Sequence, residues 1–248
     1  ITFNGAGEFD LVQVTYSNQS QTSFNLQVRQ EILPIFPKSS VATSFSMRDS
    51  ISETVITVSA TEYSQQNQQN DVQIEINGII HRIPKRSLYK TPFYEINVDY
   101  NSLSVKFTSL GETLIFVPSE YYRYFKTVVL KLPGEAKYKT RGLLGTWNDN
   151  INDEFMSKDG KLVIASCRAS TDSSVFEFGK LWAVNTTSTM FLYETEKQKQ
   201  SIQESVTQFV PEMKESVFAS VSPTMLARVQ STCASRIGTD SELLNGCT

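Results

Sequence analysis

The fold is restricted most strongly by a series of short segments, through the first half of the chain, in which apolar and polar residues alternate. In the clearest segment, three apolar residues alternate with three polar ones: Phe24, Leu26 and Val28 with Asn25, Gln27 and Arg29. A period of two sends successive side chains to opposite faces of a strand, which predicts one buried face and one solvent-facing side. Similar segments recur at 55–58, 72–76, 94–100, 103–107, 113–117 and 127–132.

The connections between these segments are also typical of antiparallel sheets. Asn77-Gly78 separates the alternating run 72–76 from the apolar run 79–83. This pair favours a two-residue hairpin, because a type I′ turn needs positive φ at both central residues. Many short strands at regular spacing favour two packed antiparallel sheets. We therefore predict a mainly β fold, a two-sheet antiparallel β-sandwich, over residues 1–195.

The apolar period changes after the predicted sandwich. Ile202, Val206 and Phe209 recur at i, i+4 and i+7, which predicts an amphipathic helix. A second helix is expected over residues 226–237 for the same reason. We therefore predict an α-helical annex over residues 196–248.

The charge balance excludes several classes of partner. A net charge of −3 with 20% charged residues leaves no excess of basic residues for nucleic acid, so neither nucleic acid nor another polyanion is an expected partner. No apolar run approaches the ~18 residues of a membrane span. The chain opens inside a strand-like Ile-Thr-Phe and carries no signal peptide, which indicates a piece of a larger protein.

Oxygen-bearing side chains are densest in the loop within residues 142–155. They fall within seven residues: Asn148, Asn150, Asn152, Asp153 and Glu154. Such oxygens suit a hard cation such as calcium, and the lack of His and Cys among them disfavours zinc. Asn and Asp also form turns with their own backbone, so a plain Asx turn is the alternative. We expect Trp147 and Phe155 to anchor the two ends of the loop in the core.

Three segments resemble the von Willebrand factor type D domain. Residues 142–155, Gly-Leu-Leu-Gly-Thr-Trp-Asn-Asp-Asn-Ile-Asn-Asp-Glu-Phe, are similar to its Gly-Leu-x-Gly-x-(aromatic)-Asn-x-Asn-x-x-Asp-Asp/Glu-Phe signature. Residues 2–12, Thr-Phe-Asn-Gly-Ala-Gly-Glu-Phe-Asp-Leu-Val, resemble its opening in membrane mucins, sushi-domain surface proteins and Mesh-like junction proteins. Residues 178–182 and 190–193 resemble its close. The resemblance covers residues 1 to about 195.

The resemblance implies a non-catalytic structural or adhesive module of a secreted or cell-surface glycoprotein, in a mucin-like, matrix or junction assembly. It implies an extracellular location, with other extracellular domains of the same parent protein or a second copy as partners. We also predict that the loop holds one stabilising Ca²⁺, with side-chain oxygens from Asn148, Asp153 and Glu154 and a backbone carbonyl from Asn150, because two adjacent carboxylates repel each other without a cation. Leu144 stands where many family members carry cysteine, so the disulfide at that point is absent.

Three cysteines are too few for a disulfide scaffold, and their spacings fit no zinc site. Cys233 and Cys247 bracket a short segment of the expected annex, and we expect them to form a disulfide worth roughly 3 kcal/mol. Cys167 would then be free or paired outside this chain. Two sequons, at Asn18 and Asn185, are glycan acceptors if the chain is secreted.

A carbohydrate- or lipid-binding extracellular module is the alternative function, which the exposed polar loops fit. An enzyme is not expected. The only histidine, His81, follows the predicted hairpin turn and lacks the setting of a positioned base. Asp153 and Glu154 are adjacent, and adjacent side chains usually diverge, whereas glycosidase carboxylates face one cleft.

Overall fold

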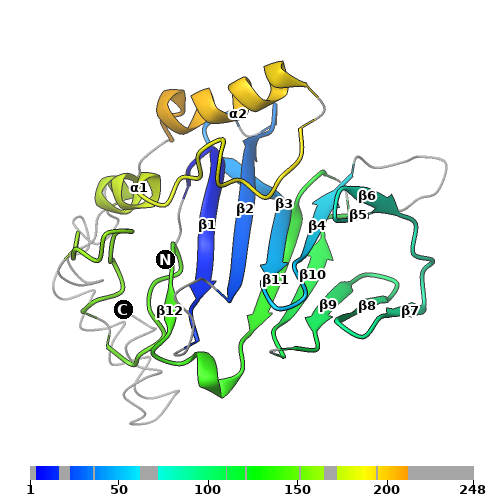
Figure 1. Cartoon of the computed structure of the whole chain (residues 1–248). Helices are drawn as coiled ribbons and strands as arrows, with labels where there is room; N and C mark the ends of the chain where they lie inside the picture. Colours follow the sequence, from blue (N-terminus) through cyan, green and yellow to red (C-terminus); the bar gives the residue numbers. More distant parts are fainter. Residues whose placement is uncertain are drawn as a thin grey trace, which may run out of the picture. The chain divides into compact units, whose positions relative to one another are not determined.

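Two antiparallel β-sheets form the fold, which confirms the predicted class (Figure 1). The structure is a computed structural model that describes residues 4–16, 23–35, 37–61, 72–109, 111–120, 122–150, 152–164, 172–193 and 195–211. These residues lie in the first of two compact units, Ile1–Glu212. The second unit, Met213–Thr248, lies outside the described residues, as do the predicted second helix and the residues Asn18, Cys167, Cys233 and Cys247.

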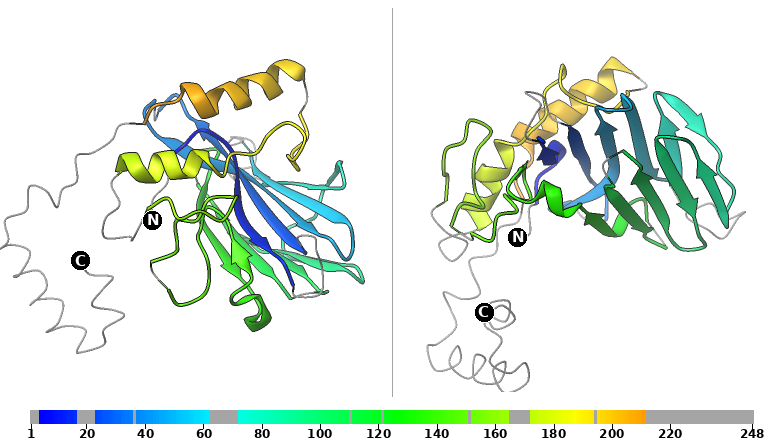
Figure 2. Two further views of the ribbon diagram at one scale, coloured as in Figure 1. Left: turned by 60° about the vertical axis from the view of Figure 1, so that its left-hand side comes forward. Right: turned by 60° about the horizontal axis from the view of Figure 1, so that its bottom comes forward.

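The first sheet has seven strands in the order β12-β1-β2-β3-β4-β5-β6. Their bounds are β1 (Gly7–Val14), β2 (Phe24–Ile32), β3 (Ser40–Asp49), β4 (Thr54–Ala60), β5 (Val72–Ile76), β6 (Ile79–His81) and β12 (Thr140–Arg141). The second sheet has five strands in the order β11-β10-β9-β8-β7. Their bounds are β7 (Ser87–Lys90), β8 (Tyr94–Val98), β9 (Leu103–Phe107), β10 (Thr113–Pro118) and β11 (Phe125–Lys131). Figure 2 shows the two sheets as separate layers.

The turn between β5 and β6 is the predicted hairpin. Asn77 and Gly78 have φ angles of 48° and 82°, so both central residues adopt the positive φ that a type I′ turn needs. Ile76 pairs with Ile79 directly across the turn. The Asn-Gly pair therefore sets the register of this hairpin.

Aromatic side chains from both sheets meet in the core. Phe24 of β2 packs edge-on against Phe107 of β9, with ring centroids 6.0 Å apart. Phe45 of β3 contacts Phe116 of β10 at 5.5 Å. Full burial of one such side chain is worth about 1.5–3 kcal/mol, so the facing aromatic rows hold the two layers together.

The predicted helix after residue 195 is present as α2 (Glu196–Gln208). The Thr195 hydroxyl accepts a hydrogen bond from the Gln198 N–H and caps the first turn. Val206 packs on Gly7 at the start of β1, where an added Cβ would lie 2.3 Å from its Cγ2. A side chain at residue 7 would therefore displace the helix from the sheet.

Several elements carry no clear sequence signal. The pattern analysis did not identify β3, β7, the 3-10 helix Gly134–Ala136 or α1 (Asp172–Lys180). In β3, the small polar residues Thr43, Ser44 and Ser46 are buried, so the strand lacks the expected alternation. Within the described residues, no helix is both long enough and apolar enough to cross a membrane.

Candidate functional site

The loop at residues 146–154 is held against β1 by the segment before it. The N–H groups of Leu143 and Leu144 donate to the carbonyls of Asp10 and Leu11, at 3.0 and 3.1 Å. Gly142 has a φ of 147°, and a Cβ there would lie 2.1 Å from the Leu11 carbonyl oxygen. Only glycine permits this approach, which fixes where the loop begins.

The two predicted anchors of the loop behave differently. Phe155 is fully buried and packs edge-on against Phe178 of α1, with centroids 5.1 Å apart, which confirms its role. The prediction for Trp147 was wrong, because 39% of this residue is exposed. Its backbone holds this end instead: the Trp147 N–H donates to the Thr140 hydroxyl at 2.6 Å, and its carbonyl accepts from the Tyr138 N–H at 2.8 Å.

The Asp153 carboxylate is the centre of the loop. Its Oδ2 accepts hydrogen bonds from the amide groups of Asn148 and Asn150, at 2.8 and 3.1 Å. Its Oδ1 accepts from the Thr146 hydroxyl at 3.0 Å. The structure therefore brings together three of the four predicted ligands.

The Glu154 carboxylate lies apart from this cluster. Its Oε2 accepts from the Thr146 N–H at 3.1 Å and lies against Gly145, where a Cβ would be only 2.0 Å away. Burial raises the pKa of Glu154, and the neighbouring charge of Asp153 raises it further. Thr146 thus uses its N–H for Glu154 and its hydroxyl for Asp153, and separates the two carboxylates.

The amide oxygens of the loop make two successive Asx turns. Asn148 Oδ1 accepts from the Asn150 N–H at 2.9 Å, and Asn150 Oδ1 accepts from the Asn152 N–H at 3.1 Å. At Asp153 the two amides present N–H groups, whereas a hard cation takes oxygen ligands, so a cation here would require the Asn148 and Asn150 side chains to turn. Within the described residues no group of three or more His, Cys, Asp or Glu gathers. The residue types fit a cation site with few charged ligands, and their arrangement in this structure is two Asx turns around one carboxylate.

Residues 184–193, which we call the strap, cover a second polar region. The strap crosses the outer face of the first sheet. Gln27 of β2 donates to the Ser188 carbonyl at 3.0 Å and accepts from the Met190 N–H at 2.8 Å. The expectation that Gln27 and Arg29 face solvent was wrong, because the strap covers them and leaves 1% and 8% exposed.

A buried ion pair fastens the strap to β1 and β2. The Arg29 guanidinium lies 2.8 Å from Oε1 of Glu8, and its plane covers the Phe191 ring at 4.5 Å. Oε2 of Glu8 accepts from the hydroxyls of Thr189 and Tyr193, both at 2.7 Å. Burial, with a contribution from Glu8, raises the pKa of Tyr193 to about 12. Both oxygens of the buried carboxylate are therefore satisfied.

Pattern analysis did not identify this network, although one signal was present. Glu8 and Arg29 are directly opposite in the β1–β2 register, so they form a cross-strand pair of opposite charge. Asp10 lies two residues further along β1. It accepts from Gln27 at 2.9 Å and pairs with Lys158 at 3.0 Å.

The remaining predicted residues lie in two different places. Asn185 is exposed at the start of the strap, and its Oδ1 accepts from the Thr187 hydroxyl at 2.8 Å and from the Thr187 N–H at 3.0 Å. His81 ends β6 and packs against the Tyr89 ring at 6.1 Å.

These features define a two-sheet β-sandwich module whose polar loop and strap are tied to its first strand. The chain belongs to the von Willebrand factor type D domain family, which matches residues 2–161. It is 30% identical over 173 residues to "Protein mesh" of Bombyx mori, covering 65% of this chain and 10% of that protein. It is 38% identical over 56 residues to "Mucin-4" of Homo sapiens, covering 23% of this chain and 1% of that protein. The chain thus spans a tenth or less of these curated relatives.

Proposed function

We propose that this chain is a non-catalytic structural or adhesive module of a secreted or cell-surface glycoprotein, within a mucin-like, matrix or junction assembly. The observation that carries the proposal is the family match, which spans both sheets and the 146–154 loop. The relatives named as a mesh protein and a mucin support an extracellular setting. Other extracellular domains of the parent protein, or a second copy of the chain, are the proposed partners.

The buried polar groups support a structural role. Glu8 and Asp10 are both at least 95% buried, and each is engaged by a cationic side chain. A general acid or base must reach a substrate proton, which carboxylates buried to this extent do not. These groups instead join segments that are far apart in the chain.

Sedimentation velocity tests the adhesive proposal. The chain is measured alone, and then mixed with the neighbouring extracellular domains of its parent protein, with and without millimolar calcium. We expect self-association or a complex with at least one neighbour. A chain that stays monomeric in every mixture, while its melting curve shows a folded protein, contradicts the adhesive function.

We also propose that the loop holds one weakly bound calcium ion. Asp153, Asn148 and the Asn150 carbonyl would supply the oxygens, and Glu154 would join them by leaving the Thr146 N–H. Calcium would supply positive charge at Asp153 Oδ2, where two amide groups now donate. A set with so few carboxylates suits the ~10⁻⁴–10⁻³ M affinity range of extracellular modules.

Two covalent features belong to the same proposal. Asn185 is the proposed principal N-glycan acceptor, because it is exposed and its hydrogen bond with the Thr187 hydroxyl uses Oδ1, which leaves the Nδ2 that a glycan would modify out of that bond. Asn18, and the disulfide between Cys233 and Cys247, lie outside the described residues and remain predictions. Glycosidase treatment of the native protein and non-reducing peptide mapping test them: an unchanged mass at both sequons, or a Cys167 to Cys233 bond, contradicts them.

A further inference from the structure

A groove of about 710 Å³ opens on the side of the sandwich where β11 and β12 are the edge strands of their sheets. One wall is formed by β11 and the residue after it, with Val128, Leu130 and Leu132 half-buried at every second position. The other wall is the segment that leads into the 146–154 loop, where 55% of Leu144 and 39% of Trp147 are exposed. The groove therefore presents apolar surface from both walls.

The backbone edge of β11 beside this groove is free. β11 pairs with β10 on one side and is the last strand of its sheet. Among the described residues, no group outside β10 forms a hydrogen bond with the main chain of residues 127–130. Natural sheets protect such edges with charged residues or proline, and residues 127–130, Thr-Val-Val-Leu, contain neither. This edge is therefore open to pairing with another strand.

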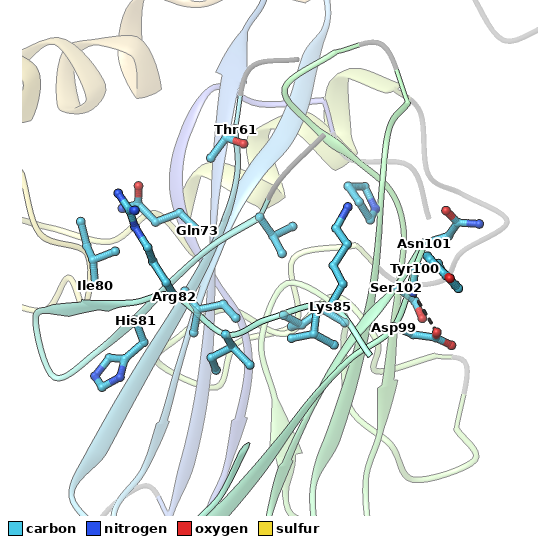
Figure 3. Close-up of a pocket in the computed structure, with 16 residues that line it drawn as sticks. Thr61, Gln73, Ile80, His81, Arg82, Lys85, Asp99, Tyr100, Asn101 and Ser102 are labelled. Atoms are coloured by element: carbon cyan, nitrogen blue, oxygen red, sulfur yellow. Dashed lines mark hydrogen bonds between the residues drawn. The ribbon is translucent and has the colours of Figure 1, made fainter. Parts of the chain in front are cut away.

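The cavity at the other end of the first sheet's strand order, beside β6, offers less apolar surface. It measures about 670 Å³, and Figure 3 shows mostly polar side chains around it, such as Gln73 and Arg82. Three of its apolar lining residues, Ile74, Val98 and Leu103, are at most 6% exposed. Side chains covered to this extent add almost nothing to a contact surface, so the groove beside β11 is the stronger docking site.

An extended segment would use the groove and the free edge together. Alternate side chains of a strand point to one face, so Val128, Leu130 and Leu132 form a row of roughly 13 Å that matches a partner strand with the same alternation. The backbone of that strand would pair with the free edge of β11, as in recognition by strand addition. A helix or a small apolar molecule would fill the groove but leave the β11 backbone groups unpaired.

Charge decides between a second copy and a different segment. Lys131 is exposed at the groove, and among the described residues no carboxylate pairs with it, whereas Lys126 pairs with Glu120 at 3.0 Å. Antiparallel pairing of two β11 strands would bring the Lys126 end of one against the Lys131 end of the other, and like charges across a strand pair are destabilising. Glu154 also lines the groove, but its carboxylate is turned to the Thr146 N–H on the opposite wall. A partner with an acidic residue beside Lys131 is therefore favoured over a second copy.

We propose that this groove takes an extended segment of a partner domain, in which apolar residues alternate with polar ones and an acidic residue flanks the run. The segment adds a strand to β11 and places its apolar side chains against Leu144 and Trp147. This inference rests on the proposed adhesive function, and it names the surface and the chemistry of the partner.

The peptide Asp-Glu-Val-Thr-Val-Thr-Val-Glu-Asp tests this chemistry. Trp147 is the reporter, because the only other tryptophan, Trp182, is 1% exposed. We expect saturable binding with a blue shift of the emission, which Trp147→Phe should remove. The peptide Asp-Glu-Val-Val-Val-Thr-Thr-Glu-Asp has the same composition without the alternation, and it should bind about tenfold more weakly because one valine leaves the groove.

N-methylated peptides test the strand pairing. Successive N–H groups of a strand point to opposite edges, so methylation of the valine nitrogens blocks one edge of the peptide and methylation of the threonine nitrogens blocks the other. One of these two peptides should lose binding, and the other should bind as the unmethylated peptide does. Equal binding by both would overturn strand addition.

Matched variants test the groove. Leu144→Asp should weaken the peptide about tenfold or more, because it places a charge in the apolar wall. Leu88→Asp is the control, since Leu88 is 59% exposed on β7, at the opposite edge of the same sheet, and it should leave the affinity unchanged. Lys131→Glu should weaken the acidic peptide about threefold and strengthen a lysine-ended counterpart by a similar factor, the size expected of a surface ion pair. Melting curves show that each variant folds.

Two of the binding results would overturn the proposal: equal weakening by Leu144→Asp and Leu88→Asp, or equal affinity for the acidic and the lysine-ended peptides. Sedimentation velocity separates this inference from the proposed function. Leu144→Asp should abolish the complex with the neighbouring domain, and a complex that survives it supports adhesion but overturns the groove as its site. Peptide binding by a chain that forms no complex in any mixture supports the groove and contradicts the adhesive function.

Discussion

Replacement of Arg29 by methionine should destabilise the chain strongly, because it leaves a buried charge without its partner. Methionine keeps an unbranched side chain and removes only the guanidinium. That group lies 2.8 Å from Oε1 of Glu8 and 4.5 Å from the centroid of the Phe191 ring. The Glu8 side chain is 3% exposed, so water cannot replace the lost partner.

The structure sets the size of this effect. Removal of one member of a buried ion pair costs about 3–5 kcal/mol, because the remaining charge stays desolvated. The hydroxyls of Thr189 and Tyr193 still donate to Glu8, which places the expected loss near the lower end of that range. For a domain of this size, 3 kcal/mol corresponds to a fall in Tm of about 6–12 °C. A typical domain has only about 5–15 kcal/mol of stability, so the variant should fold marginally.

Urea unfolding, followed by tryptophan fluorescence and circular dichroism, measures the loss. Arg141→Met is the matched control, because Arg141 is exposed and its guanidinium donates to the exposed-side partner Gln13, so its effect should stay within about 0.5 kcal/mol. Glu8→Gln in the Arg29→Met background should recover part of the loss, since it removes the unpaired charge. A loss below about 1 kcal/mol for Arg29→Met, or no recovery in the double variant, would refute the argument from burial.

Four further predictions concern the loop, the strap and α2. Millimolar calcium should raise Tm relative to excess EDTA, and Asp153→Ala should abolish the shift; coincident curves would leave a plain pair of Asx turns. Glu154 has a raised pKa when folded, so its ionised form opposes folding: stability without calcium should increase as pH falls from neutral toward the ordinary value of 4.5, and Glu154→Gln should flatten that part of the urea-derived pH profile. The pKa of Tyr193 is raised from 10.0 to about 12, so its contribution is complete below pH 10 and should be lost between pH 10 and 12, a loss that Tyr193→Phe should remove from the alkaline melting profile. Gly7→Ala should destabilise the chain, because the new Cβ would meet Val206. Gly160→Ala is the control: its φ is also positive, at 77° against 128° for Gly7, and the new Cβ meets nothing within 4 Å, so it reports the cost of a positive φ without a clash. Equal losses for the two variants would contradict a specific contact with α2.

The loop shows how far local pattern predicts a site. Asn148, Asn150 and Asp153 meet as the density of oxygen-bearing side chains indicates, because they lie on one short turn. The position of Glu154 depends instead on Gly145 and Thr146, which offer it a small backbone and an N–H on the other side. Trp147 is a large aromatic residue of the kind that anchors loops in a core. In this structure its backbone is held by a hydrogen bond to Thr140, while its side chain is partly exposed.

The sequence by itself determined the strands β2, β4, β5 and β8 to β11, the Asn77-Gly78 hairpin, the helix α2 and the family, since period and turn chemistry act between residues close in the chain. Only the tertiary structure decided which polar face of a strand is exposed to solvent. Gln27 lies in a segment that alternates as an amphipathic strand should, yet it hydrogen-bonds to Ser188, 161 residues later. No local sequence pattern predicts this contact, because the strap and β2 are far apart in the chain and meet only in the folded structure.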